Sequence, residues 1–366
     1  MSNAFIHEIG KIRVKASSNR KPHFRIISWI EGAPLPDGSR GTSLTFILPT
    51  RACKFAEAKH GGCSMCGYPN ENPPEPPQEL LETLPAKLME IFETKKVAGP
   101  MVVKFFTSGS FLDRLELPVH IREKILSNFA QIEQIKEIII ESRAEYVIRR
   151  NLESITKVAD PSKLTIAIGL ETADDDVNKR SINKGMTWKQ FTRAVKLSFQ
   201  HNVRIKAYVL LKPLFVSEIF AVKDALRTAK KAAEIGVESI SINSSNIQRG
   251  TLMEKLFFQQ SYRPPWLWSS LFVTRRIKQE FPNIRVICDP VASGHERGPH
   301  NCGRCDDLFK KALSEFSYTQ DLTHLTGLSC QCLEQYKTFL TSEQMNTGFG
   351  VCYDELRLNK GRLKRN

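Results

Sequence analysis

Apolar runs alternate along this chain with segments in which apolar residues recur every three or four positions. The spaced pattern is that of an amphipathic helix, and QELLETLPAKLMEIFETKK and VSEIFAVKDALRTAKKAAEIG both show it. The runs are short, rich in β-branched residues and almost continuously apolar, which is typical of strands covered on both faces. Six strands are predicted in this way, at residues 43–49, 101–107, 137–141, 164–170, 204–211 and 239–243. Their alternation with helices predicts an α/β fold, a partial barrel of six strand–helix units around a parallel sheet.

The alternation divides the chain into three regions. Residues 1–38 lack it and close on the turn-rich segment EGAPLPDGSRG, so they are expected to be an irregular, basic extension. Residues 39–260 hold the predicted barrel, and residues 261–366 are expected to be a smaller cysteine-bearing region with a basic tail. No apolar run reaches the roughly 18–20 residues of a membrane helix, and the N-terminus lacks a signal-peptide core. We therefore expect a cytoplasmic protein without a membrane partner.

The charge of the chain points to a polyanionic partner. The 366 residues include 53 Lys and Arg against 39 Asp and Glu, a formal net charge of +14. Six basic residues lie within the first 25 positions, and five lie in the final segment RLNKGRLKRN. Because counterion release favours the binding of basic segments to nucleic acids, both ends are predicted to contact a phosphate backbone. A merely basic cytosolic protein is the alternative.

Three of the nine cysteines follow the first predicted strand. Cys53, Cys63 and Cys66 have the spacing C-x9-C-x2-C. Three thiolates can hold a four-iron cubane and leave one iron open to an outside ligand. A tetrahedral zinc site would want a fourth protein ligand, which His60 in the same segment could supply. The spacing favours the cluster and leaves zinc as an alternative.

Four more cysteines form two close pairs about 25 residues apart. They are Cys302, Cys305, Cys330 and Cys332. Two such pairs predict a structural zinc site. Replacement of one cysteine ligand by His295 or His300, a second iron–sulfur cluster, and no metal at all are the alternatives. The isolated Cys288 and Cys352 are expected to be plain thiols.

Polar residues follow the predicted strands at their carboxyl ends. The segments are FFTSGSFLD, ESRAEY, GLETADDD, LLKPLF and NSSNIQRG. In a parallel barrel the carboxyl ends of the strands form one rim, where ligands bind. We therefore expect these side chains to converge beside the cysteine loop. Taken singly, each of these residues can also have a purely structural role instead of binding a ligand. TSGS can cap a helix, Arg143 can pair with Glu145, and Glu171 can cap the following helix.

Seven segments together resemble the radical S-adenosylmethionine (SAM) superfamily. They are RACKFAEAKHGGCSMCGYPNE, KFFTSGSFLD, IIIESRAEYV, IAIGLETADDDVNKRSINKGMT, IKAYVLLKPLF, INSSNIQRGTLME and RGPHNCGRCD, and they span roughly residues 40–310. The resemblance is closer to the elongator-like branch and, within it, to the RaSEA-type proteins of archaeosine biosynthesis. Two features depart from the commonest pattern of the superfamily: the first cysteine gap is nine residues, and Met65 occupies a position that is often aromatic.

The resemblance implies a [4Fe-4S] cluster on the three-cysteine loop, with SAM bound at its open iron, and a set of SAM contacts around it. The implied contact residues are Met65, Ser108, Gly109, Ser110, Glu141, Ser142, Arg143, Glu171 and Lys212. Gly109 would allow close approach of the backbone, Arg143 would bind the SAM carboxylate with its planar fork, and Glu171 would accept from ribose hydroxyls. Lys212 would face SAM or substrate. No residue is singled out as a catalytic group.

RaSEA-type proteins complete archaeosine, a formamidine-bearing 7-deazaguanosine of tRNA. The resemblance implies a substrate in which a partner enzyme, the archaeosine synthase ArcS, has attached lysine to 7-cyano-7-deazaguanine in tRNA. The implied reaction removes hydrogen from the lysine carbon beside the amidine nitrogen and cleaves that carbon–nitrogen bond, with electrons from an external donor. Trp266 and Trp268 could stack on bases, although a place in a domain interface is favoured.

Two other functions are left open by the residues. Another elongator-like tRNA modifier, of the methylthio- or carboxymethyl-type, would share the barrel. Such enzymes are expected to carry a further cysteine cluster or an acetyltransferase domain, and residues 1–52 hold no cysteine. A non-catalytic RNA-binding protein with two zinc sites would share both groups of cysteines.

Overall fold

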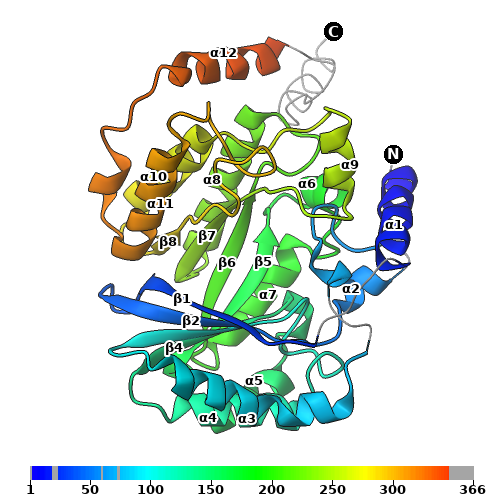
Figure 1. Cartoon of the computed structure of the whole chain (residues 1–366), viewed down its shortest axis with the longest axis vertical. Coiled ribbons are helices and arrows are strands. Elements are labelled where there is room, and N and C mark those ends of the chain that lie inside the picture. Colours follow the sequence, from blue (N-terminus) through cyan, green and yellow to red (C-terminus); the bar gives the residue numbers. More distant parts are fainter. Residues whose placement is uncertain (1, 19–23, 59–60, 72–74, 346–366) are drawn as a thin grey trace.

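A computed structural model describes residues 2–18, 24–58, 61–71 and 75–345. Its central feature is one eight-stranded sheet whose strands follow one another in chain order (Figure 1). The strands are β1 (Ile27–Pro34), β2 (Arg40–Ile47), β3 (Met101–Phe106), β4 (Ile135–Glu141), β5 (Leu164–Glu171), β6 (Arg204–Leu211), β7 (Ser239–Ser244) and β8 (Arg285–Ile287). β1 is antiparallel to β2, and each later strand is parallel to the one before it. The sheet is curled into an open half-barrel, as the alternating pattern predicts.

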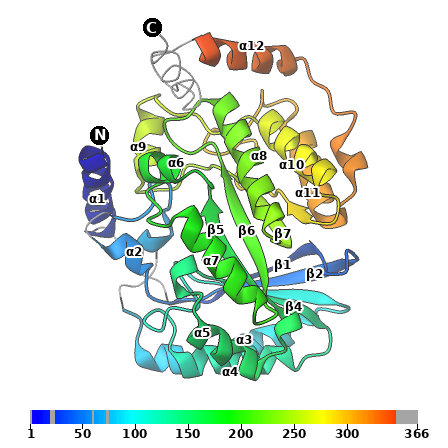
Figure 2. The same cartoon turned by 180° about the vertical axis from the view of Figure 1, so that it is seen from behind.

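Helices cover the outer side of the curl, and Figure 2 shows α7 and α8 in front of the strands. The long helices after the first strands are α3 (Gln78–Lys95), α4 (Val119–Ala130), α5 (Arg149–Val158), α7 (Trp188–Phe199), α8 (Glu218–Glu234), α10 (Leu267–Glu280) and α11 (Asp306–Thr319). Their apolar faces meet a fully buried core, in which Phe105 of β3 packs edge-on against Phe129 of α4 at 5.0 Å between ring centroids. A local signal fixes the start of α7, where Thr187 and Gln190 form a reciprocal capping box.

The other helical segments lie on the rim or flank the sheet. They are α2 (Lys54–Glu57), α6 (Asp175–Val177), α9 (Leu252–Phe258), α12 (Cys332–Met345), the 3₁₀ turns Tyr68–Asn70, Ala144–Tyr146, Pro161–Lys163 and Leu322–Leu325, and the π-helical turn Asn178–Ile182. None of the helices in the described part of the chain is both long and apolar enough to cross a membrane.

All six predicted strands are present as β2 to β7, with boundaries that differ by a few residues at most. The predicted α/β half-barrel is therefore confirmed. The sheet extends beyond the expected limits of 39 and 260, because β1 adds an antiparallel edge and β8 adds a further parallel strand. Neither strand shows the continuous apolar run by which the other strands were predicted. β1 is mostly exposed, and β8 has only three residues.

The expectation that residues 1–38 are irregular is wrong. This region forms β1 and the helix α1 (Ser2–Ser18). Phe5, Ile9 and Ile12 recur at helical spacing and join a satellite cluster with Leu252 and Met253 of α9. The helix is stabilised by this contact with α9, and its low mean hydropathy explains why the sequence pattern missed it.

Candidate functional site

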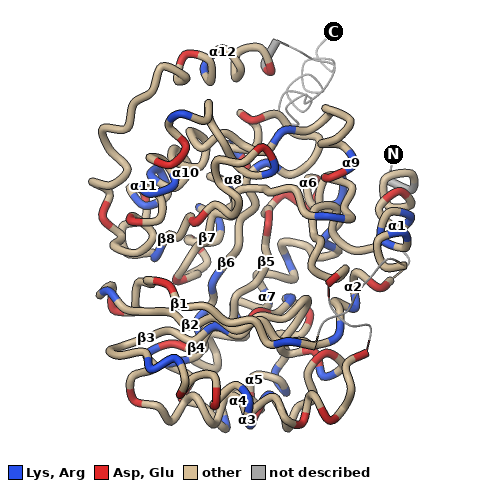
Figure 3. Tube along the Cα trace, viewed as in Figure 1, with Lys and Arg blue, Asp and Glu red and all other residues tan. Residues whose placement is uncertain are grey.

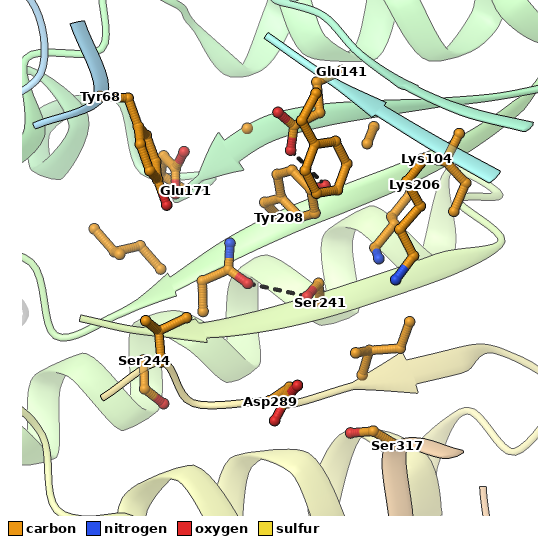
Figure 4. A pocket seen from close by; sticks show the side chains of 18 of the residues that line it. Tyr68, Lys104, Glu141, Glu171, Lys206, Tyr208, Ser241, Ser244, Asp289 and Ser317 are labelled. Carbon is orange, nitrogen blue, oxygen red and sulfur yellow. Dashed lines mark hydrogen bonds between the residues drawn. The ribbon is translucent and has the colours of Figure 1, made fainter. Parts of the chain in front are cut away.

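The concave face of the sheet lines a cavity of about 760 Å³. Because successive side chains of a strand point to opposite faces, alternate residues of each strand enter it. In β6 these are Lys206, Tyr208 and Leu210. Figure 4 shows the labelled polar side chains converging from several strands and from the segment after β8. The cavity is therefore a polar chamber inside an otherwise apolar barrel.

The three-cysteine loop lies at the rim of this cavity. Cys63 and Cys66 line the cavity, whereas Cys53 is 9% exposed directly before α2 and does not. The loop is tied to the turn after β5, where Asn183 donates from Nδ2 to the carbonyl oxygen of Gly62 at 2.7 Å. Gly62 has a φ of +80°, and a Cβ there would overlap the backbone of α2, so only glycine fits.

The three thiols suit a cluster better than a single ion. Sulfur ligands about 2.3 Å from one tetrahedral zinc lie about 3.8 Å apart. Among the described residues, Cys53, Cys63 and Cys66 do not bring their sulfur atoms within 4.8 Å of one another as a set. Burial raises the pKa of Cys53 and of Cys66, and the neighbouring Cys63 adds to the effect at Cys66, so a bound cation is needed to keep them as thiolates. His60, the alternative zinc ligand, lies outside the described residues.

Most residues expected to contact SAM border the same cavity. Those that line it are Met65, Ser108, Gly109, Glu141, Ser142, Arg143 and Glu171. They come from the cysteine loop and from the carboxyl ends of β3, β4 and β5. The expected convergence of strand ends beside the cysteine loop is present in the structure.

Arg143 is both a cavity residue and a member of an ion pair. Its Nε donates to Glu145 at 2.5 Å, and its Nη2 donates to the carbonyl oxygen of Lys184 at 2.9 Å. Its guanidinium lies 4.4 Å from the ring centroid of Phe55. Nη1 makes no hydrogen bond within the described ranges, so the pairing with Glu145 leaves both N–H groups of Nη1 for a ligand carboxylate.

Two carboxylates of the rim have different partners. Glu171, in left-handed conformation at φ +62°, accepts from Nζ of Lys184 at 2.9 Å. A Cβ at Gly169 would overlap both members of this pair, so the glycine permits the contact. Glu141 accepts from the hydroxyl of Tyr208 at 2.8 Å, and burial raises the pKa of Glu141 to about 7. One carboxylate is thus paired with a cation, and the other can hold a proton near neutral pH.

Ser110 and Lys212 do not border the cavity. Ser110 is fully buried and accepts from the backbone N–H of Arg143 at 3.1 Å, so it supports the rim from behind. Lys212 is ion-paired with Glu218 at 2.7 Å. Its φ of +66° turns the chain at the end of β6, which explains why its side chain leaves the face that Lys206 shares. The expectation that Lys212 faces SAM or substrate is not met in this conformation.

Three charged residues of the cavity were not predicted from the sequence: Lys104, Lys206 and Asp289. Lys104 and Lys206 lie inside strands, and Asp289 follows β8. In β6 the sequence does indicate that polar side chains share one face of the sheet. The run RIKAYVLL places Lys206 and Tyr208 two positions apart, and residues two apart in a strand point to the same side.

The second group of cysteines forms a compact four-sulfur set. The sulfur separations are 3.8 Å for Cys302–Cys305 and 3.7 Å for Cys302–Cys330 and Cys305–Cys332. All four sulfur atoms lie within 4.8 Å of one another. These values match the edge of about 3.8 Å expected for four sulfurs around one zinc. Trp268 donates from Nε1 to the sulfur of Cys332 at 3.3 Å, a supporting contact of the kind that orients metal ligands.

The rival histidines lie apart from this set. His295 is exposed, and His300 directs Nδ1 to the carbonyl oxygen of Gly298 at 2.8 Å. Trp266 and Trp268 are both buried, which speaks against base stacking, and a place in a domain interface stays a prediction. Trp266 packs against Tyr336 and Phe339 of α12, and Trp268 packs edge-on against Phe309 of α11.

Cys288 is fully buried and its backbone N–H donates to the hydroxyl of Ser317, as expected for a core thiol. Cys352 lies outside the described residues. So does the basic tail, and only part of the basic N-terminus is described. Figure 3 shows Lys and Arg on many elements, including α1. On α1, Lys11 and Lys15 are exposed, whereas Arg13 is 6% exposed and faces the cysteine loop.

Comparisons with known proteins agree with this geometry. Residues 47–226 match the profile of the Radical SAM superfamily. The archaeosine synthase subunit beta of Methanosarcina acetivorans is 37% identical over 92% of this chain and 95% of its own length. The subunit of the same name from Thermococcus kodakarensis is 40% identical over 82% of this chain and 92% of its own. Among solved structures, an N-terminally truncated Elp3 of Methanocaldococcus infernus superposes with a TM-score of 0.48 at 10% identity, over 64% of this chain and 58% of that one.

Proposed function

Because the chain belongs to the radical SAM superfamily and, within it, to the family of archaeosine synthase beta subunits, we propose that it completes archaeosine by cleaving a lysine adduct of 7-cyano-7-deazaguanine in tRNA. The bond to be cleaved joins the lysine ε-carbon to the amidine nitrogen, so that the nitrogen stays on the base as the formamidine. One observation supports this assignment beyond the family: a single cavity connects Cys63 and Cys66 at the rim with a buried polar chamber that reaches Lys206.

The residues at the rim fit the cofactors of this superfamily. Cys53, Cys63 and Cys66 would hold a [4Fe-4S] cluster, and SAM at its open iron would supply a 5′-deoxyadenosyl radical when bound. A Cβ at Gly109 would overlap the carboxylate of Glu116, so the glycine permits the chain to pass this close to Glu116 while it lines the cavity. The chain itself orients the ligands and excludes water, since the chamber walls are strands of the barrel.

At the rim, the carboxyl group of Glu141 and the hydroxyl of Tyr208 form a hydrogen-bonded pair that can exchange a proton within the cavity. Because the pKa of Glu141 is raised to about 7 by burial, its carboxyl group can hold a proton at neutral pH. We assign to this pair the positioning and protonation of the amidine that remains on the base. The hydrogen that the radical removes comes from the lysine ε-carbon. Return of one electron from that carbon radical to the cluster, followed by addition of water to the resulting iminium carbon, would release the carbon chain as an aldehyde and leave the nitrogen on the base.

The function implies several partners. The tRNA would be bound through the excess of basic residues, and the enzyme that attaches lysine would act first on the same tRNA. An external electron donor would reduce the cluster. A structural zinc at Cys302, Cys305, Cys330 and Cys332 would tie α12 to α11, away from the chamber. All of these partners are available in the cytoplasm, where we place the reaction.

Mass spectrometry of tRNA nucleosides tests the proposal. Reduced, reconstituted enzyme is incubated with SAM and adduct-bearing tRNA, and the nucleosides are then compared with those of a reaction without reductant. The proposal predicts loss of the lysine adduct and appearance of the formamidine nucleoside. Persistence of the adduct while SAM is cleaved would contradict the proposed reaction.

A further inference from the structure

A lysine without an ionic partner points into the inner part of the cavity. Lys206, in the first half of β6, is 6% exposed and lines the cavity (Figure 4). Among the described residues its side chain makes no hydrogen bond or ion pair, and its ammonium lies 5.4 Å from the ring centroid of Tyr208. Burying an unpaired charge is costly, so such a group is retained where a ligand completes it.

A second lysine stands beside it. Lys104 of β3 lines the cavity with its ammonium next to that of Lys206 in Figure 4. Lys104 donates to Oε1 of Glu31 at 2.8 Å, and Glu31 is itself partly exposed at the edge strand β1. Because β4 and β5 lie between β3 and β6 in the sheet, only the curl brings the two lysines together. Two cations therefore converge on one point of the chamber.

The acidic groups nearest to Lys206 are occupied by other partners. The ionisable groups around it are Lys104 of β3, Glu137 and Glu141 of β4, and Arg285 of β8. Both carboxylate oxygens of Glu137 accept from Arg285 at 2.7 Å, and Glu141 accepts from Tyr208. Burial, and then the charges of Lys104 and Arg285, lower the pKa of Lys206 to about 7. An anion beside it would restore the charged form.

The depth of this point favours a small anion over a nucleic-acid backbone. Lys206 lies five residues before the end of β6, about 16 Å below the rim at roughly 3.3 Å per residue. A carboxylate at the end of an extended side chain can reach this depth. Asp289 is exposed, its side chain makes no hydrogen bond or ion pair within the described ranges, and it borders the same cavity from the segment after β8 (Figure 4).

We propose that Lys206 and Lys104 bind the α-carboxylate of the amino-acid part of the substrate, and that Asp289 binds its α-ammonium. This inference rests on the proposed function, and it assigns to the chamber the recognition of a zwitterionic amino-acid end. The subsite would place the far end of the lysine moiety on the chamber floor and its ε-carbon nearer the rim. Specificity for an amino-acid adduct over a simple amine adduct then resides in these three residues.

The subsite is tested by binding of free small molecules, without turnover. Saturation-transfer NMR on the reconstituted protein compares L-lysine, 6-aminohexanoate, which lacks the α-amino group, and cadaverine, which lacks the carboxylate. We expect L-lysine to bind most tightly and cadaverine about tenfold or more weakly. Equal binding of L-lysine and cadaverine, or no binding of L-lysine, overturns the proposal. Displacement of L-lysine by inorganic phosphate at equal concentration, with no preference for L-lysine, assigns a phosphate site instead and also overturns it.

Substitutions of Lys206 test whether L-lysine binds at the proposed subsite. Lys206→Met is expected to lower L-lysine binding at least tenfold, and Lys206→Arg is expected to retain most of it, because the arginine keeps the charge. Lys230→Met removes an equal charge from an exposed pair with Glu280 and should leave binding unchanged. Unchanged binding by Lys206→Met overturns the proposal. Because this assay needs no radical chemistry, L-lysine binding without archaeosine formation refutes only the proposed reaction, and archaeosine formation without L-lysine binding refutes only the subsite.

Discussion

Arg13 of α1 donates a hydrogen bond from Nη2 to the carbonyl oxygen of Cys66 at 2.5 Å, across 53 positions of sequence. Its Nε donates to the carbonyl oxygen of Gly61 at 3.0 Å, and its Nη1 donates to Asn70 at 2.6 Å. One buried guanidinium thus holds both ends of the segment that carries the second and third cysteines. A residue that the sequence placed in an RNA-binding arm is instead part of the support of the candidate cluster.

The contact predicts a loss of cluster occupancy on substitution of Arg13. Arg13→Met removes three charge-assisted hydrogen bonds, each worth about 1.5–3 kcal/mol, and should lower the iron bound per chain after anaerobic reconstitution. Lys15→Met removes a charge from the exposed side of the same helix and should leave iron content unchanged. If both variants keep their iron and lose tRNA affinity equally, Arg13 belongs to a phosphate-binding arm instead.

The four-sulfur set predicts a metal that is independent of the iron. Cys330→Ser should remove one zinc per chain, lower the thermal midpoint by several degrees and leave iron content intact. Cys288→Ser, at a buried thiol outside the set, serves as the control and should keep both metals. Elemental analysis of the purified variants measures this directly. Loss of iron without loss of zinc in Cys330→Ser would show that the second set holds a cluster.

The floor of the barrel should depend on the pair of Glu137 and Arg285. Glu137→Gln leaves a buried arginine without its counter-charge and is expected to destabilise the fold by about 3–5 kcal/mol. The double variant with Arg285→Met should be destabilised by less than the sum of the single variants. Glu31→Gln, which breaks the partly exposed pair with Lys104, should cost about 1 kcal/mol or less. Urea unfolding gives all four values, and additivity of the two single changes would contradict the coupling.

Stability should also depend on pH through Lys206. Its pKa in the folded protein is lowered to about 7, mainly by burial, whereas the ordinary value is 10.5. Between these values the unfolded chain binds more protons than the folded one, so stability rises with pH, by at most about 1.4 kcal/mol per pH unit. The wild type should therefore gain stability relative to Lys206→Met between pH 7 and pH 9. A constant difference in urea midpoint across this range would show that Lys206 is not perturbed.

The strands and the rim could be predicted from sequence because their patterns are local. Runs such as IIIE in β4 identify a buried strand, and the segments that follow the strands identify the ligand-binding edge. The chamber could not be predicted in the same way. Lys104 and Lys206 are 102 positions apart, and only the curl of the sheet places their side chains together.

Two errors have the same local origin. Lys212 directly follows β6, in which Lys206, Tyr208 and Leu210 face the cavity. The left-handed backbone of Lys212 turns its side chain toward Glu218 instead. Arg13 lies among exposed basic residues, and its burial depends on the distant cysteine loop. In both cases the nearest residues in sequence indicate the wrong partner, because a tertiary contact decides the orientation.

The proposed reaction depends most directly on an open iron in a cluster held by Cys53, Cys63 and Cys66. Mössbauer and electron paramagnetic resonance spectra of the anaerobically reconstituted protein measure this before and after addition of SAM. We predict a four-iron cluster with one distinct iron whose parameters change when SAM is added, and loss of this signal in Cys63→Ser. Four equivalent irons that do not respond to SAM, or a colourless protein that binds only zinc, would contradict the account.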